Sequence, residues 1–315
     1  MMCLNPLTIE LNDESREKRM AKTYMPLEWR FATHVTVPCG KCEACMSRRR
    51  SQWSLRLTNE VADSESCYFI TLTYDDDKIN YTPDGFPCVC KKDVQDFLKR
   101  FRKSLEPFKI RYFVVSEYGP KTLRPHYHML LFNYPHLLDN KLDENIRTAW
   151  RNGFIRVDPV NPARINYVTS YCLDSSTLPK GYVKNFMLCS RRPGIGSGYL
   201  DKDVILSYHR DSMDDWCYLP QDGKVIKVKM PRYYSDKIFS EESRDEIVLE
   251  NAKYADRERK KLIKSHRRWL IKHHYDVNEA TLKTAYDGSP LKNVLDFRDD
   301  FVAKVRSKCK LKNQI

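Results

Sequence analysis

Two β-rich runs joined by a short loop lie in the middle of the chain and limit the folds open to it. They read KIRYFVVSEYG at residues 109–119 and RPHYHMLLF at residues 124–132. Runs rich in β-branched and aromatic residues favour strands, and the short loop favours antiparallel pairing. Successive side chains of a strand point to opposite faces, so His126 and His128 share one face of the expected sheet.

The segments around these runs alternate between strand and helix patterns. Residues 68–74 favour a strand, and the apolar residues of KKDVQDFLKRFRKSLEP (residues 91–107) recur at helical spacing. The other expected elements are a basic helix at 43–62, a helix in 141–153 closed by Gly153, a strand at 154–160 and a helix in 164–174. From residue 68 onward this order predicts an α+β fold of split βαβ type, with an antiparallel sheet and helices packed on one face.

Composition divides the chain into three expected regions. Residues 1–62 are rich in cysteine and basic, residues 63–190 carry the sheet, and residues 191–315 are basic and mainly helical. The C-terminal region includes KYADRERKKLIKSHRRWLIKHH at residues 253–274, which suits a solvated helix face as well as a DNA-binding one.

The net charge of +13 predicts a polyanionic partner, and nucleic acid is the usual one. A merely basic globular protein is the alternative on charge alone. No apolar run approaches the roughly 18 residues that a membrane span needs, and the N-terminal residues lack the apolar core of a signal peptide. We therefore expect a cytosolic protein with no membrane partner.

The two histidines suggest a metal site if a third ligand joins them. Imidazole suits borderline cations such as Mn²⁺ and Zn²⁺, while carboxylate oxygen suits harder ones. Glu117 ends the preceding strand, and in a tight antiparallel pair its carboxylate lies beside His126 and His128. Such a triad binds a cation that polarises a phosphodiester. The alternative is a pair of passive strand histidines and a solvent-facing glutamate.

A tyrosine pair follows in RINYVTSYCLD (residues 164–174). Tyr167 and Tyr171 are four residues apart, so they share one face of a helix. A tyrosine hydroxyl can act as a covalent nucleophile in phosphoryl transfer, although such pairs more often serve core packing. Beside a metal triad and a positive charge, the pair forms a coherent candidate site.

Eleven cysteines in a cytosolic chain favour reduced thiols or metal ligands over disulfides. Cys39, Cys42 and Cys45 form a C-x₂-C-x₂-C motif, and a structural zinc ion needs a fourth ligand. Cys3 is the nearest candidate, and Cys88 or Cys90 is a rival source. An iron–sulfur cluster and unmetallated thiols remain alternatives.

Basic residues beside aromatic ones predict contacts with single-stranded DNA, whose bases stack and whose phosphates need neutralising. The alternative for the first group is a surface helix with a buried tryptophan. The candidates are Arg48, Arg49, Arg50, Trp53 and Arg56, then Arg124 and Lys184, and finally Arg191 and Arg192 beside the glycine-rich loop at 190–200.

The chain resembles the HUH endonucleases, which are named for two histidines flanking a bulky hydrophobic residue. Within them it is similar to the replication initiators of the microviruses, of gokushovirus type, and the resemblance implies the RRM-like sheet of that superfamily. The glutamate-to-histidine stretch is the most specific part. The matching stretches are VPCGKCEACMSRRRSQW (37–53), ITLTYDDD (70–77), VVSEYGPKTLRPHYHMLLF (114–132), INYVTSYC (165–172) and SRRPGIGSGYL (190–200).

The resemblance implies rolling-circle initiation in the cytoplasm of an infected bacterium. Glu117, His126 and His128 correspond to the family's ligands for Mg²⁺ or Mn²⁺, and Tyr167 and Tyr171 to its nucleophiles. One tyrosine cuts origin DNA, leaving a 5′-phosphotyrosine link and a free 3′-hydroxyl for host replication proteins. The second enables rejoining of the displaced strand.

One departure from the family concerns the lysines that often follow each tyrosine by three residues. Here those positions hold Ser170 and Asp174, so Lys180 or Lys184 would have to replace them. Two other functions stay open: a metal-independent phosphohydrolase that uses His-x-His directly, and a zinc-containing DNA-binding protein without catalysis.

Overall fold

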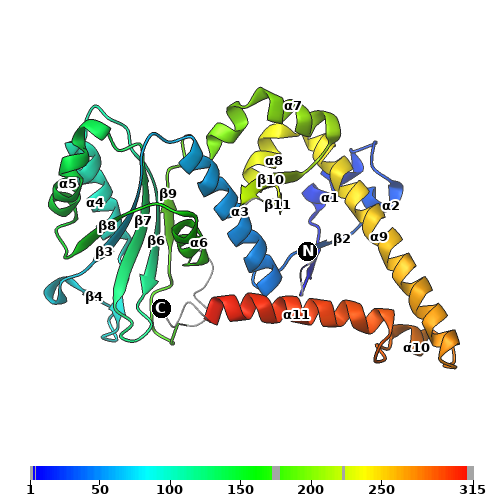
Figure 1. Cartoon of the computed structure of the whole chain (residues 1–315). Coiled ribbons are helices and arrows are strands. Elements are labelled where there is room, and N and C mark those ends of the chain that lie inside the picture. Colours follow the sequence, from blue (N-terminus) through cyan, green and yellow to red (C-terminus); the bar gives the residue numbers. More distant parts are fainter. Residues whose placement is uncertain (1–2, 4, 172–177, 222–223, 311–315) are drawn as a thin grey trace. The chain divides into compact units, whose positions relative to one another are not determined.

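A computed structural model of the chain describes residues 3, 5–171, 178–221 and 224–310 (Figure 1). The chain forms two compact units that are interleaved in sequence. One comprises residues 1–48, 208–215 and 232–315, and the other comprises residues 49–207 and 216–231. This grouping differs from the three consecutive regions expected from composition. Among the described helices, none is long and apolar enough to cross a membrane.

A five-stranded antiparallel sheet organises the second unit, with the strand order β8-β3-β7-β6-β9. Its central pair is the predicted one: β6 places Glu117 opposite His126, and Val115 opposite His128, on β7. On the other side of β7, β3 places Thr71 opposite His128. The strands are β3 (Cys67–Thr73), β6 (Arg111–Tyr118), β7 (Pro125–Phe132), β8 (Ile155–Pro159) and β9 (Met187–Cys189).

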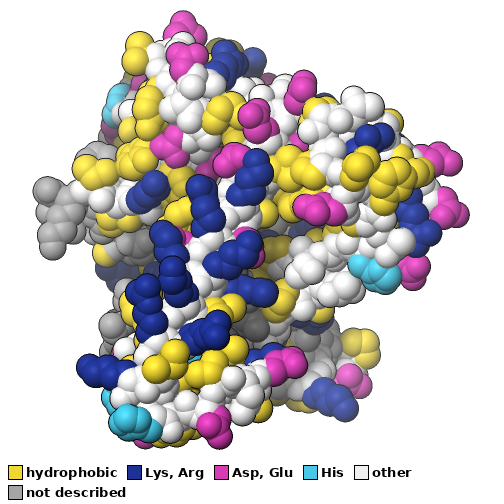
Figure 2. Space-filling model, turned by 90° about the vertical axis from the view of Figure 1, so that its right-hand side faces the viewer, with side chains coloured by type: hydrophobic (Ala, Val, Ile, Leu, Met, Phe, Trp, Pro, Cys, Tyr) yellow, Lys and Arg dark blue, Asp and Glu magenta, His cyan; other side chains and the backbone are white. Residues whose placement is uncertain are grey.

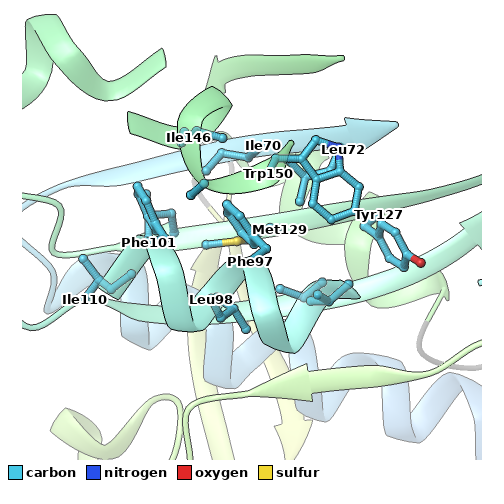
Figure 3. Close-up of a cluster of buried hydrophobic side chains, with 14 of the residues drawn as sticks. Ile70, Leu72, Phe97, Leu98, Phe101, Ile110, Tyr127, Met129, Ile146 and Trp150 are labelled. Atoms are coloured by element: carbon cyan, nitrogen blue, oxygen red, sulfur yellow. The ribbon is translucent and has the colours of Figure 1, made fainter. Parts of the chain in front are cut away.

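The larger hydrophobic core lies on the face of the sheet that α4 (Lys91–Ser104) and α5 (Leu142–Trp150) cover. Figure 3 shows Phe97 and Trp150 from these helices against Ile70, Tyr127 and Met129 from the strands. The Trp150 indole is fully buried and donates a 2.8 Å hydrogen bond to the carbonyl of Thr73. Apolar residues at helical spacing on α4 and at every second strand position build this core.

Helices also cover the opposite face, so the prediction of helices on one face only is wrong. There α3 (Glu43–Ala62) contributes Leu57, and α6 (Pro162–Tyr171) contributes Ile165 and Val168, to a second core. Phe113 and Leu130 are the strand residues beneath them. Alternation along β6 and β7 puts Glu117, His126 and His128 on this second face.

Gly153 does not close α5 as the sequence suggested, because Arg151 is the left-handed residue at the helix end, with φ 57°. Gly153 has φ 150°, and a Cβ there would lie 2.4 Å from the backbone nitrogen of Asp75. The glycine is therefore required by the close approach of two backbones.

The glycine-rich loop is held by a buried ion pair. Glu60 of α3 pairs with Arg111 of β6, and its carboxylate also accepts a 2.6 Å hydrogen bond from the Gly196 amide. Arg111 donates to the carbonyls of Pro193 and Gly194, 3.0 Å away in each case. The other elements of this unit are η1 (Asp76–Lys78), β4 (Asn80–Tyr81), β5 (Pro87–Cys88), η2 (His136–Lys141), η3 (Ser197–Asp201), β10 (Trp216–Gln221) and β11 (Lys224–Lys229).

The first unit contains a small hairpin and a long basic helix. Lys22 forms ion pairs of 2.8 Å and 2.6 Å with Glu241 and Asp245 of that helix, α9. Figure 2 shows Lys and Arg side chains gathered on one face of the molecule. The elements of this unit are β1 (Leu7–Glu10), α1 (Asp13–Met20), α2 (Leu27–Arg30), β2 (His34–Val37), α8 (Arg232–Ile238), α9 (Glu241–Lys272), α10 (Glu279–Lys283) and α11 (Pro290–Lys310); α3 and α7 (Asp203–Ser212) have residues in both units.

Candidate metal centre and nucleophile

A single carboxylate oxygen gathers the candidate ligands. Glu117 Oε2 lies 2.7 Å from His128 Nε2 and 3.2 Å from His126 Nε2. The two imidazole rings stand at 85° to each other with their centroids 5.1 Å apart. Glu117 and His128 are buried and His126 is half-buried. The three ligand atoms lie within 4.8 Å of one another, as a shared cation would require.

The protonation of these groups fits a cation at their centre. Burial would raise the pKa of Glu117, but hydrogen bonds from His126 and His128 outweigh it and lower that pKa to about 2. Burial lowers the pKa of His128, which favours its neutral form. Because lone pairs of one carboxylate and two imidazoles converge, either a proton or a metal cation must lie between them.

Hydrogen bonds from the far side of each ring orient the two histidines. His126 Nδ1 lies 3.1 Å from the carbonyl oxygen of Arg124, and His128 Nδ1 lies 3.2 Å from Thr71 Oγ1. A metal-binding histidine commonly makes this kind of outward bond, which fixes the tautomer with Nε2 free to ligate. The donor set, geometry and outward partners all fit a divalent cation held by Glu117, His126 and His128.

Tyr167 points at this centre from α6. Its hydroxyl donates a 3.3 Å hydrogen bond to Glu117 Oε2, and its ring meets that of His128 at 79° with centroids 5.1 Å apart. Helix α3 holds α6 at the preceding residue: Arg50 donates to the Asn166 carbonyl at 3.3 Å, and the Ser54 hydroxyl donates to Asn166 Oδ1 at 3.2 Å.

The second half of the predicted nucleophile pair is described less fully. Tyr171 is the last residue of α6, and its side chain and Asp174 lie outside what the structure describes. Ser170 turns its hydroxyl back to the Tyr167 carbonyl, 2.5 Å away, so it helps to fix the helix. Lys180 and Lys184 are exposed.

Several predicted DNA contacts also have structural partners. Trp53 packs on Phe113 with centroids 5.0 Å apart, and Arg56 lies 4.4 Å above the Trp53 ring. Arg124 pairs with Asp76. Of the remaining candidates, Arg49, Lys184, Arg191 and Arg192 are exposed, while Arg48 and Arg50 are half-buried.

The predicted cysteine group comes together in the first unit. The Sγ atoms of Cys3, Cys39, Cys42 and Cys45 all lie within 4.8 Å of one another. Cys88 and Cys90, the rival ligand source, lie in the other unit.

Sequence reasoning did not identify two residues that shape the centre. Phe69 stacks on His128 at 18° with centroids 5.4 Å apart, and Thr71 contacts the same ring through its hydroxyl. Both lie on β3, on the face shared with the histidines. The period-two pattern of that strand, paired with the strand of the histidines, was the signal available for them.

Comparison with known proteins gives relatives of one kind. Residues 67–176 match the family of replication-associated protein ORF2 and gene 2 protein. Replication-associated protein ORF2 of Spiroplasma virus 4 is 28% identical over 293 residues, which cover 84% of this chain and 87% of that protein. Replication-associated protein ORF4 of Chlamydia phage 1 is 25% identical, over 69% of this chain and 57% of that protein. Replication-associated protein VP4 of Bdellovibrio phage phiMH2K is 27% identical, over 63% and 66%.

Among solved structures, the N-terminal nuclease domain of the minute virus of mice non-structural protein 1 aligns with 56% of this chain and 89% of its own. The identity is 11% and the TM-score is 0.20. A TM-score this low carries no argument about fold or function, so the evidence for the site lies in its own geometry.

Proposed function

Because this chain belongs with the replication-associated proteins of the microvirus phages, we propose that it starts rolling-circle replication by nicking DNA at the phage origin. The proposed nuclease is of HUH type, depends on Mg²⁺ or Mn²⁺ and uses Tyr167 as its first nucleophile. It acts in the cytoplasm of the infected bacterium, where the new 3′-hydroxyl serves host replication proteins.

One observation carries this proposal: Glu117 Oε2 lies within 3.3 Å of both histidine Nε2 atoms and of the Tyr167 hydroxyl. Core packing alone does not require a buried carboxylate, two imidazoles and a phenol to converge. A divalent cation held there supplies Lewis-acid polarisation of a phosphodiester. The tyrosine then stands within reach of the polarised phosphate.

The proposed reaction exchanges one phosphoester bond for another. Tyr167 Oη attacks the phosphorus and forms an O–P bond, while the P–O3′ bond breaks and its electron pair leaves with O3′. The phenolic proton passes toward the Glu117 carboxylate, its hydrogen-bond partner. The departing 3′ oxygen takes up a proton from solvent, which leaves a free 3′-hydroxyl and a 5′-phosphotyrosine.

In the proposed cycle, Tyr171 cuts the next copy of the origin and the released 3′-hydroxyl attacks the first phosphotyrosine. This closes the displaced single strand into a circle. The helical spacing of four residues supports the division of labour, because it places both tyrosines on one face of α6. Exposed Arg191, Arg192 and Lys184 are proposed to bind DNA phosphates.

The test uses single-stranded oligonucleotides tiled across the genome that encodes the chain, each labelled at its 3′ end. The fragment downstream of a nick keeps the 3′ label and becomes attached to the protein, so a labelled adduct appears on a denaturing gel. We expect the adduct with Mn²⁺, and its loss with a chelator, in Glu117→Ala and in Tyr167→Phe. Tyr254→Phe is the matched control, because Tyr254 is an exposed tyrosine of α9.

Two outcomes would replace the proposal. Cleavage that persists with a chelator and in Glu117→Ala would favour a metal-independent phosphohydrolase that uses the histidines directly. Tight binding of single-stranded DNA without cleavage or adduct, with any divalent cation, would favour a DNA-binding protein without catalysis.

A further inference from the structure

The four cysteines of the N-terminal segment lie far apart in sequence but close in space. The Sγ of Cys3 is 3.5 Å from that of Cys39 and 3.6 Å from that of Cys42. A disulfide requires about 2.05 Å between sulfurs, and all four cysteines are free. In a tetrahedral zinc–thiolate site, Zn–S bonds of about 2.3 Å put the sulfurs roughly 3.8 Å apart. The observed separations match a shared metal ion and do not match disulfides.

The backbone around the sulfurs is arranged for thiolates. The amide of Cys39 donates to the Cys3 sulfur at 3.3 Å, and the amide of Cys42 donates to the Cys39 sulfur at the same distance. The Lys41 amide also donates to Cys39, at 3.5 Å. Gly40 makes this tight turn possible with φ 72°, a conformation that other residues adopt at a cost. Donors aimed at sulfur stabilise its anionic, metal-binding form.

Strand pairing explains how Cys3 reaches the motif. β1 and β2 form an antiparallel pair in which Leu7 lies opposite Val37. Cys3 precedes β1 and Cys39 follows β2, so the register brings both to the same end of the pair. Cys42 stands just before α3, and Cys45 lies in its first turn.

This segment has little else to hold it together. Among the described residues up to 48, the buried hydrophobic side chains are those of Met25, Cys42 and Ala44. On β1, Leu7 and Ile9 remain 51% and 47% exposed. Short segments that lack a core of their own commonly depend on a metal ion or disulfides.

We infer that Cys3, Cys39, Cys42 and Cys45 bind one structural Zn²⁺ ion that closes the N-terminal segment against the start of α3. The site supplies four protein ligands, which complete the tetrahedral shell and leave no open position for substrate. Binding converts four thiols into thiolates and releases four protons, with no change of oxidation state. The inference is independent of the nicking reaction, whose ligands lie in the other unit.

The first experiment counts metal in the full-length protein by mass spectrometry of the elements. The Glu117→Ala/His126→Ala variant removes ligands of the other site, so any zinc it retains belongs to the cysteines. We expect about one zinc per chain in this variant, and less than half of that after further Cys39→Ser and Cys42→Ser substitutions. Cys88→Ser is the matched control and should keep the zinc. Zinc content that does not depend on Cys39 and Cys42 would overturn the inference.

A second experiment needs no cysteine variant and therefore survives poor folding. X-ray absorption at the zinc edge of the Glu117→Ala/His126→Ala protein should show a shell of sulfur alone, at about 2.3 Å. A shell of nitrogen and oxygen near 2.0 Å, or purified protein that holds iron and sulfide, would overturn the assignment. Chelation should also speed tryptic cleavage before residue 42, and an unchanged rate would overturn the structural role.

Discussion

Thr71 provides a test of the metal centre that touches neither a ligand nor the nucleophile. Its hydroxyl lies 3.2 Å from His128 Nδ1, on the side of the ring away from Glu117. When His128 Nε2 ligates a cation, Nδ1 carries the proton and donates it to this hydroxyl. Thr71→Val keeps the shape of the side chain and removes the acceptor.

The size of the effect follows from the burial of His128, which is 5% exposed. Loss of such an outward partner typically weakens metal binding by about 10- to 100-fold, or roughly 1.4–2.7 kcal/mol. Isothermal titration of the metal-free protein with Mn²⁺ measures this change directly. Thr71→Ser keeps a hydroxyl and should stay near the wild-type affinity.

Thr73→Val is the matched control, because the Thr73 hydroxyl donates to the Phe154 carbonyl instead of an imidazole. It should leave Mn²⁺ affinity within about twofold of wild type, well below the loss of an outward partner. Equal affinities for Mn²⁺ in Thr71→Val and wild type would refute the reasoning, since Thr71 would then not orient a ligand.

Three further predictions concern stability and DNA binding. The pKa of Glu117 is held near 2, below its ordinary value of 4.5, so metal-free protein should lose stability as pH falls from about 4.5 toward 2. Urea unfolding at several pH values should show a flatter dependence in Glu117→Gln, and identical slopes would contradict the assigned cause. Glu60→Ala leaves the buried Arg111 without its ion pair and should cost about 3–5 kcal/mol in urea unfolding. The exposed pair Lys253–Glu250 is the control, where Glu250→Ala should cost under about 1 kcal/mol. Arg191→Ala and Arg192→Ala should each lower the salt dependence of single-stranded DNA binding by about 0.7 in the log–log slope. Unchanged slopes would remove these two residues from the DNA surface.

Much of the sheet unit could be read from local patterns. The helix expected at 43–62 has the observed bounds of α3, and the strand expected at 68–74 is displaced by one residue from β3. The convergence of Glu117 on His126 followed from hairpin register, because strand pairing converts sequence spacing into spatial distance. Here local periodicity and long-range structure agree.

Tertiary contacts account for what the sequence did not reveal. Arg50 and Arg56 were expected at a DNA surface, yet they donate to the carbonyls of Asn166 and Ile195. Trp53 packs against Phe113 on the second face of the sheet. An arginine that binds a backbone carbonyl and one that binds phosphate present the same letters in a sequence, so only packing separates these roles.

The central claim is that Tyr167 becomes joined to DNA, and peptide mass spectrometry of the adduct tests it most directly. Nuclease treatment leaves a short nucleotide on the protein, and trypsin releases residues 165–180, which contain Tyr167 and Tyr171 together. Fragment ions assign the modified residue. The account predicts the nucleotide on Tyr167 after a single cut of linear substrate in Mn²⁺. A nucleotide found on Tyr171 alone, or outside this peptide, would contradict it.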